Sequence, residues 1–579
     1  MMDKRALLAI VLTFLVIFFW GIIQSHFFPP PPVEQPQKEV KEIKEVKKEE
    51  VVSAEKKDIK PPKEAKPLSK PRVVPKKEIS VETQNYLAVF TNENARLKQF
   101  KLKHYENRVE ESVITIKLKQ FFQNLFGSKA QETKKPELLD IVNTKEEEGL
   151  PLGLHIQQAT DGEGWEVDKE RIGLLKKGEK GEIIFSKTID NGLKLLKKYV
   201  FYSEKNVIDL EVEIQNTTSN EISTQIGLEW IGRVELERFA DEENKDFGLK
   251  YVYLKDQKVE RKDLGGVGAS GCTPGCGAPK KRIEPFESSD KGSIGWYAFE
   301  GEYFAALLVP TSQEKNILLS VKGYERNLLK AQLTHPTLTL QAKESAKIPY
   351  KIYIGPKVTD QLKELGVGAE ALIDFGFFTI VAKPLLWFLK LTHTVTKNFG
   401  IDIIILSILI KIIFLPLTQI SMKSMKEMQK VQPEMNRLKQ QFKNDKARLQ
   451  QEIMLLYKRR KINPMSGCLP MLIQIPVFIA LYNALQNSIE MRHAPFVLWI
   501  MDLSAKDPIY VTPIIMGATM VIQQKMTPTA ADPAQARIFM LMPIMFTFLF
   551  LNFPSGLVLY WMVTNILSIA HQYYMNKKR

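Results

Sequence analysis

A lysine in the middle of a long apolar run constrains this chain more than any other residue. Lys411 lies ten residues into the run that begins at Ile401, IDIIILSILIKIIFLPLTQ. In a helix that rises about 1.5 Å per residue, this position is roughly 15 Å deep in a hydrocarbon core about 30 Å thick. A cation there costs at least about 2.5–3.5 kcal/mol, so the ammonium should face a wet cavity or the interior of a bundle.

Two ordinary explanations compete with a functional one. A membrane lysine can snorkel to the bilayer surface, but its side chain reaches only a few ångströms, too little for a position in mid-helix. A structural ion pair would need a carboxylate. Asp402 is the only one in the run, and nine residues of separation put it on the opposite helix face. We therefore interpret Lys411 as a candidate functional residue.

The composition indicates that the chain contains both a soluble part and a membrane part. Charged residues make up 25% of the 579 residues, yet several stretches are long and apolar, and the length permits two or three domains. The net charge of +15 could indicate nucleic-acid binding. A basic excess beside membrane spans is more typical of cytoplasmic loops and anionic lipid. The chain carries no zinc-finger spacing and no aromatic–basic platform, so no sequence-specific nucleic-acid partner is predicted.

The three cysteines fall in two settings. Cys272 and Cys276 form a C-x3-C pair in the Gly/Pro-rich loop GGVGASGCTPGCGAPKK. If this loop lies outside the cytoplasm, the pair predicts a small disulfide. A metal site would need two further ligands, and the neighbouring sequence offers none, so no metal or cofactor is predicted. Cys468 begins an apolar run, where cysteine is usually a small buried residue.

The first 77 residues predict an anchor and a tether. Lys4 and Arg5 precede the apolar run from Ala6 to Ile23, and no small-residue cleavage site follows, so residues 1–28 are interpreted as an uncleaved transmembrane anchor rather than a secretory signal. Residues 29–77 are rich in Pro, Lys and Glu and predict a disordered linker.

Residues 78–365 change to short alternating segments such as KLLKKYVFYSEKNVIDLEVEIQNTT, separated by Gly, Asn and Asp turns. Apolar residues at every second position predict a large, mainly antiparallel β domain, and a sandwich is the favoured arrangement. The segment shows no nucleophile elbow, phosphate loop or paired carboxylates. A non-enzymatic protein is therefore predicted.

The remainder predicts a polytopic helical membrane protein. Residues 370–397 are amphipathic and aromatic, which favours an interfacial helix lying on the bilayer. The part 400–576 holds five predicted spans, which with the anchor makes six transmembrane helices. These spans are about 400–420, 467–488, 508–526, 537–552 and 556–574.

Charge predicts the orientation. The segment 421–466 carries twelve Lys or Arg, whereas the loop 489–507 has only Arg492 and Lys506. The positive-inside rule then places both termini and 421–466 in the cytoplasm and the β domain outside. The cytoplasmic segment reads as a helical hairpin, basic at Arg459 and Arg460. Its methionines predict either packing between the two helices or an adaptable surface for apolar segments; they include Met422, Met425 and Met428.

Polar side chains form stripes on three predicted spans. Such stripes often join helices to one another. Because they accompany a buried cation and contain no acid, a wet groove explains them better. The stripes comprise Ser407, Lys411 and Thr418 on the first core span, Thr512, Thr519 and Gln523 with adjacent Gln524 on the third, and Trp561, Asn565 and Ser568 with neighbouring Tyr560 on the last.

Several long motifs resemble those of the YidC membrane protein insertases. They are LPLTQISMKSMKEMQKVQPEMNRLKQQF, QEIMLLYKRRKINPMSGCLPMLIQIPVFIALYNAL, APFVLWIMDLSAKDP and FPSGLVLYWMVTN, and the resemblance covers about 370–575. Weaker similarity continues upstream through IGWYAFEGEYFAALLVP, as in Gram-negative members. The resemblance implies a periplasmic β-super-sandwich and a five-helix core around a groove open to cytoplasm and lipid.

The same resemblance implies roles for residues. The groove cation, commonly Arg in the family, falls on Lys411, which keeps the charge but loses the bidentate fork. The groove glutamine falls on Gln523 or Gln524, and the aromatic of the last span falls on Trp561, with Tyr560 beside it. The resemblance implies insertion of nascent membrane proteins into the bacterial inner membrane. The implied partners are the Sec translocon, the ribosome, targeting factors and anionic lipid.

Two other function classes remain open at this point. A polytopic transporter or channel would favour internal repeats and a second intramembrane charge, and the sequence shows neither. A membrane-tethered periplasmic carbohydrate-active enzyme is suggested only by analogy with other large β-sandwiches, and no acid pair is identifiable.

Overall fold

The computed structural model describes most of the chain after residue 73. The predicted anchor 1–28, nearly all of the linker 29–77 and all three cysteines lie outside the described residues. These are 74–126, 135–157, 164–189, 191–233, 250–263, 285–312, 314–324, 328–443, 445–460, 469–527 and 533–577.

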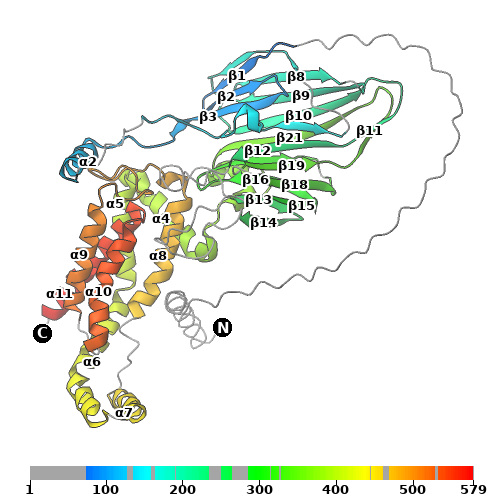
Figure 1. Ribbon diagram of the computed structural model, residues 1–579. Helices are drawn as coiled ribbons and strands as arrows, with labels where there is room; N and C mark the ends of the chain where they lie inside the picture. The colour runs from blue at the N-terminus through cyan, green and yellow to red at the C-terminus, as the bar shows by residue number, and fades with distance from the viewer. Residues whose placement is uncertain are drawn as a thin grey trace, which may run out of the picture. The chain divides into compact units, whose positions relative to one another are not determined.

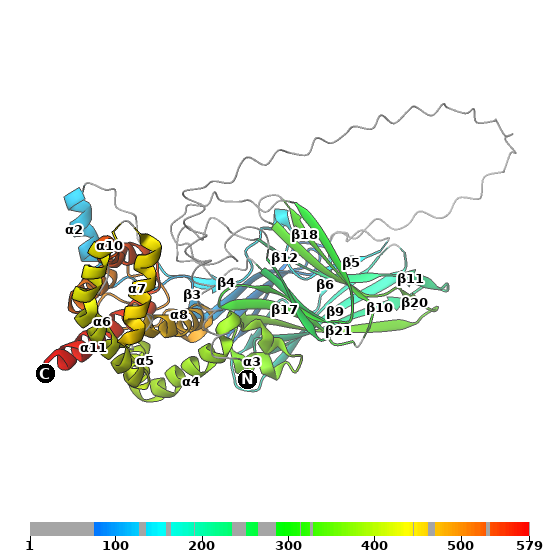
Figure 2. The same cartoon turned by 90° about the horizontal axis from the view of Figure 1, so that it is seen from below.

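The first half of the described chain is a stack of β-sheets, and Figure 2 shows the layer with β12 and β18 apart from the layer with β9, β10 and β21. Neighbouring strands pair antiparallel except β1 and β7, which are parallel. One five-stranded sheet has the order β4-β3-β2-β1-β7. Its strands are β1 (Glu78–Thr83), β2 (Tyr86–Thr91), β3 (Arg96–Glu106), β4 (Leu138–Asp140) and β7 (Arg171–Leu174).

The largest sheet has nine strands, in the order β14-β13-β16-β17-β21-β10-β9-β8-β6. They are β6 (Glu166–Val167), β8 (Lys180–Thr188), β9 (Leu193–Tyr202), β10 (Val207–Asn216), β13 (Lys250–Lys255), β14 (Lys258–Asp263), β16 (Ile294–Glu300), β17 (Phe304–Pro310) and β21 (Ser345–Pro356).

A second five-stranded sheet has the order β15-β18-β19-β12-β5, and β11 pairs with β20 alone. The strands are β5 (Gly153–Ile156), β11 (Ile222–Thr224), β12 (Ile226–Arg233), β15 (Phe286–Gly292), β18 (Ile317–Tyr324), β19 (Leu328–Thr334) and β20 (Leu338–Leu340).

Sequence period explains which face each strand buries. In β9 and β10 alternate residues are buried, and the buried set enters one core shared by all the larger sheets. Strand β17 is buried at every position because both of its faces are covered. Phe304 and Leu308 face that shared core, whereas Ala305 and Leu307 pack against α3 (Thr359–Glu364) and η4 (Ala369–Leu372).

One helix interrupts the domain that was expected to be mainly β. Helix α2 (Val113–Phe126) follows β3 and precedes β4. Ser112 caps it, since its Oγ accepts from the Thr115 amide at 3.1 Å. The short 3-10 turn η1 (Glu146–Glu148) follows β4.

The second half of the described chain is helical, and Figure 1 shows α8 to α11 side by side. Clusters of buried apolar residues join α4, α5, α8 and α11, and a further cluster joins α8, α9, α10 and α11. The elements are η5 (Gly376–Phe378), α4 (Thr379–Thr396), α5 (Phe399–Ile413), α6 (Leu415–Gln441), α7 (Lys446–Arg459), α8 (Leu469–Asn487), η7 (Ile489–Met491), α9 (Val511–Met526), α10 (Pro533–Phe550) and α11 (Ser555–Lys577).

The expected straight span over 400–420 is instead bent at Phe414, between α5 and α6. Pro416 stands at the start of α6 and has no N–H to continue the hydrogen-bond ladder, so the helix breaks. Within the described residues, no helix taken singly combines the length and apolarity of a membrane span. Helices α5 and α6 do so only as a pair, with a bend of 59° between them.

Candidate functional site

Lys411 lies in the last turn of α5, immediately before the bend, rather than in the middle of a straight helix. Its Nζ donates to Ser568 Oγ of α11 at 2.7 Å, and the side chain is half-buried. No ion pair joins it to a carboxylate in the part of the chain that the structure describes. The carbonyl end of α5 favours a nearby cation by about 0.3–1 kcal/mol, a fraction of the cost of burying one.

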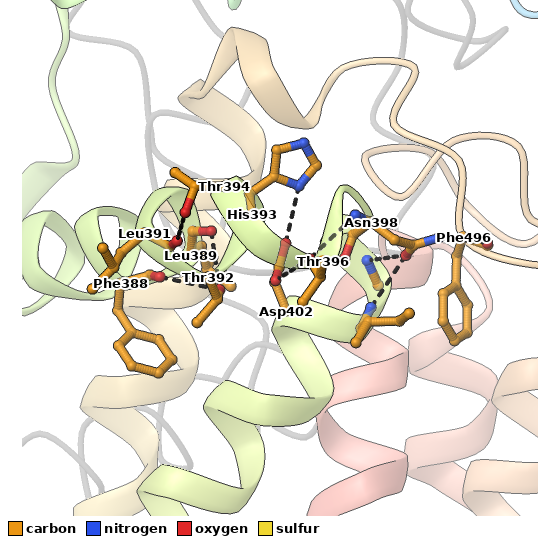
Figure 3. A network of polar contacts seen from close by, with 12 residues as sticks. Phe388, Leu389, Leu391, Thr392, His393, Thr394, Thr396, Asn398, Asp402 and Phe496 are labelled. Carbon is orange, nitrogen blue, oxygen red and sulfur yellow. Dashed lines mark hydrogen bonds and ion pairs between the residues drawn. The ribbon is translucent and has the colours of Figure 1, made fainter.

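Asp402 takes no part in this site, as its helical spacing predicted. The carboxylate is completely buried at the other end of α5. It accepts from Thr396 Oγ1 at 2.7 Å and contacts His393 Nδ1 at 3.0 Å (Figure 3). The His393 ring also stacks on Phe399, with ring centroids 3.7 Å apart. This network fastens α4 to α5 and leaves Lys411 without an acid.

Helix α11 directs a row of polar side chains toward α5 and α9. Beyond Ser568, Asn565 Nδ2 lies 3.4 Å from Thr519 Oγ1, and Gln572 Nε2 donates to Thr527 Oγ1 at 3.1 Å. Trp561 Nε1 and Gln572 Oε1 are buried and have no hydrogen-bond partner among the described residues. A buried polar atom without a partner costs about 1–3 kcal/mol. The Trp561 N–H is therefore suited to donate to, and Gln572 Oε1 to accept from, a polar group that is not part of the fold.

Two members of the predicted stripe on the first core span bond their own helices. Ser407 Oγ donates to the Ile403 carbonyl at 2.6 Å, and Thr418 Oγ1 donates to the Phe414 carbonyl at 2.8 Å. The bend also separates them, because Ser407 lies on α5 and Thr418 on α6. Among the described residues, Lys411 thus bonds to α11, whereas the two hydroxyls bond to backbone carbonyls four residues earlier.

The predicted aromatic pair of the last span has two different settings. Tyr560 is fully buried in the core shared by α5, α8 and α11, so it offers no surface to a passing segment. Trp561 is half-buried and packs edge-on against Phe478 of α8 at 5.1 Å and beside Phe550 of α10 at 5.4 Å. Of the two, only Trp561 is partly accessible.

The predicted glutamines lie near the end of α9. Gln523 and Gln524 are both half-buried, and the Gln523 carbonyl accepts from Thr527 Oγ1 at 2.8 Å. No group of three or more His, Cys, Asp or Glu in the described segments is placed to hold a metal ion.

Comparisons with known proteins agree with this architecture. Residues 78–388 match the family model described as YidC periplasmic domain, and residues 391–579 match the model described as 60Kd inner membrane protein. The chain is 40% identical over 590 residues to the "Membrane protein insertase YidC" of Syntrophus aciditrophicus (strain SB), covering 100% of both chains. The protein of the same name from Geotalea daltonii is 39% identical over 580 residues, which are 100% of this chain and 99% of that one.

The chain belongs to the YidC family. The resemblance inferred from sequence motifs is confirmed, and the chain carries both the periplasmic domain and the inner-membrane domain of the family.

Sequence analysis missed one residue beside the cation of this YidC-family chain. His571 lies on α11, within electrostatic range of the Lys411 ammonium. Both of its ring nitrogens are buried without a hydrogen-bond partner among the described residues. Its spacing was the available signal, because a residue three positions after Ser568 shares the same helix face.

The hairpin of this YidC-family chain is packed through its methionines. Met422 and Met435 are buried, and Met428 packs against the cluster formed by Val431, Met435 and Leu456. Arg459 and Arg460 are both exposed, and Arg460 also pairs with Glu434 across the hairpin. Met425 is half-buried. Packing between the two helices accounts for Met428 and Met435.

Proposed function

We propose that this chain inserts nascent membrane proteins into the bacterial inner membrane through a hydrophilic groove open to cytoplasm and lipid, alone or beside the Sec translocon. The observation that carries the proposal is Lys411, a half-buried cation that is bonded to a serine and paired with no carboxylate in the described chain. Family membership supports the same function.

The groove acts by lowering the barrier to polar segments. The client is the nascent membrane protein being inserted, and its outer segment is the part that crosses to the periplasm. Lys411 attracts an acidic or polar outer segment. The Coulomb attraction is about 3 kcal/mol for unit charges 5 Å apart in a medium of dielectric constant near 20. The polar row on α11, Asn565, Ser568 and Gln572, supplies hydrogen bonds to that segment. Trp561 offers an apolar edge along which the client helix leaves for lipid. Transfer of the apolar helix into lipid drives the step, and no reaction is catalysed.

The proposed topology has six membrane spans. The anchor at 1–28 is one, and the five-helix core consists of α5 with the start of α6, α8, α9, α10 and α11. Helix α4 lies at the interface, which is supported by its exposed apolar residues Ile380, Trp387 and Val395. Both termini and the hairpin are cytoplasmic, and the β domain is periplasmic.

The proposed partners of the hairpin are cytoplasmic. Its basic surface, which includes Arg459 and Arg460, suits the ribosome, targeting factors and anionic lipid. Nascent chains would pass from these partners to the groove.

Charge at position 411 provides the direct test. Lys411→Arg should insert clients normally, Lys411→Met should be weaker, and Lys411→Glu should lose about tenfold or more for a client with acidic outer residues. The matched control is the same client with those acids replaced by amides, which the three variants should insert to similar extents. Normal insertion of the acidic client by stably expressed Lys411→Glu protein would refute the role of the cation.

Deletion of about 425–460 tests whether the hairpin captures clients before they pass through the groove. The loss of the hairpin should impair acidic and neutral clients alike, while the bundle remains in the membrane. A deletion that spares neutral clients would show that the hairpin is only an electrostatic accessory.

A further inference from the structure

Helix α2 turns apolar side chains outward. Val113 is 66% exposed, Phe121 is 60% exposed and Ile114 is 39% exposed, whereas Thr115 is buried. In a soluble domain the arrangement is normally the reverse, with the apolar face of a helix against the core. The helix therefore presents a surface that suits an apolar environment.

The sequence of α2 is amphipathic and basic. Ile114, Leu118 and Phe121 are spaced i, i+4 and i+7, which places them on one face. Lys117 and Gln120 lie with Val113 on the neighbouring face, and all three are exposed. The helix, VITIKLKQFFQNLF, contains lysine but no acid. An apolar face bordered by lysine is typical of helices that lie in the headgroup region of a membrane.

The strand that leads into α2 is joined to the helical domain. The carbonyl of Glu106, the last residue of β3, accepts from Arg492 Nη2 at 2.6 Å. The Arg492 guanidinium also lies 5.3 Å from the ring centre of Phe304, which packs edge-on against Tyr105 of β3. Arg492 belongs to the loop between α8 and α9, on the periplasmic side in the proposed topology.

Only a short segment separates this contact from α2. Residues 107–112 join Glu106 to Val113, and these seven residue steps span at most about 25 Å. A helix on so short a connection stays close to the ends of α8 and α9. Under the proposed topology, those ends lie at the periplasmic surface of the bilayer.

We propose that α2 binds the periplasmic leaflet of the membrane. Ile114, Leu118 and Phe121 enter the region between headgroups and acyl chains, and Lys117 contacts anionic phospholipid headgroups. The β domain thereby gains an attachment to the bilayer besides the chain segments on either side of it. This inference rests on the proposed orientation of the β domain but not on the groove.

The test places a fluorophore on α2 in the full-length protein. With the native cysteines replaced by serine, Ile114→Cys is labelled with an environment-sensitive dye and reconstituted into phosphatidylcholine–phosphatidylglycerol vesicles that contain a spin-labelled lipid. Matched controls are Gln120→Cys on the neighbouring face of α2 and Lys258→Cys, exposed on β14. Lipid quenching should be several-fold stronger at position 114 than at either control. Adding Lys117→Glu should weaken quenching at 114 in these vesicles but have little effect in vesicles of phosphatidylcholine alone.

Two results would overturn the proposal. One is equal, weak lipid quenching at positions 114 and 120. The other is a dye at 114 shielded from both the lipid quencher and aqueous iodide, which would mean that α2 packs on protein. Client insertion measured in the same vesicles reports on the groove separately, so a failure of α2 to bind lipid is distinguishable from a failure of insertase function.

Discussion

The buried carboxylate of Asp402 offers a sharp test of how α4 is held to α5. It is completely buried, accepts a hydrogen bond from Thr396 and contacts the His393 ring, and it lies in the first turn of α5. The same corner, where the end of α4 meets the start of α5, also contains Asn398. This residue caps α5, and its Nδ2 donates to the Phe496 carbonyl at 2.9 Å (Figure 3). Removal of the carboxylate should loosen this corner without altering the groove.

The size of the effect follows from these contacts. A hydrogen bond to a charged group contributes about 1.5–3 kcal/mol. Asp402→Ala removes the acceptor of both contacts, but His393 is 31% exposed and can rehydrate in part. We therefore expect a loss of about 2–4 kcal/mol for alanine and about 1–2 kcal/mol for Asp402→Asn, which keeps one acceptor oxygen.

Thermal unfolding and hydrogen exchange of the purified protein measure this effect. Both variants should unfold at lower temperature, in the order Ala below Asn below the parent, and amides at the end of α4 and start of α5 should exchange faster. His393→Gln should cost less in the Asp402→Ala background than in the parent, because the shared contact is already lost and only the stacking on Phe399 remains to be lost. An Asp402→Ala protein with parental melting and parental exchange at this corner would refute the reasoning.

Three further predictions concern other sites. Lys197, completely buried in the β domain, donates to two backbone carbonyls, so Lys197→Met should lower the free energy of unfolding of that domain by about 2–4 kcal/mol in urea titrations followed by tryptophan fluorescence. The pKa of His493 is lowered from 6.5 to about 3, mainly because the ring is buried and also because the Arg492 charge is close. Because the unfolded chain binds the proton first, stability should fall as pH drops below 6.5, by about 2 kcal/mol near pH 5, and His493→Gln should flatten this dependence in melting experiments. Cys272 and Cys276 should resist alkylation until they are reduced, and free thiols in protein isolated without reductant would contradict the disulfide.

The sequence alone determined the classes of structure along this chain. Alternation in KLLKKYVFYSEKNVIDLEVEIQNTT predicted strands, and β9 and β10 bury alternate residues as that period requires. Apolar runs located α8 to α11 to within a few residues, apart from a longer start to α10. Hydrophobic period and run length are local properties, because they follow from the geometry of one strand or one helix. Local motifs likewise sufficed for the family.

The tertiary structure decided which polar groups meet. The sequence identified Lys411 as a cation within an apolar run, but its hydrogen-bond partner Ser568 is 157 residues away in the chain. Spacing put Ser407 in the same stripe, yet its hydroxyl bonds the backbone of its own helix. Helix α2 interrupts a stretch that alternates elsewhere. A side chain's partner depends on how its helix is rotated against its neighbours, and packing of the whole bundle sets that rotation. Periodicity within one segment shows which side chains share a face but not which groups of another helix that face meets.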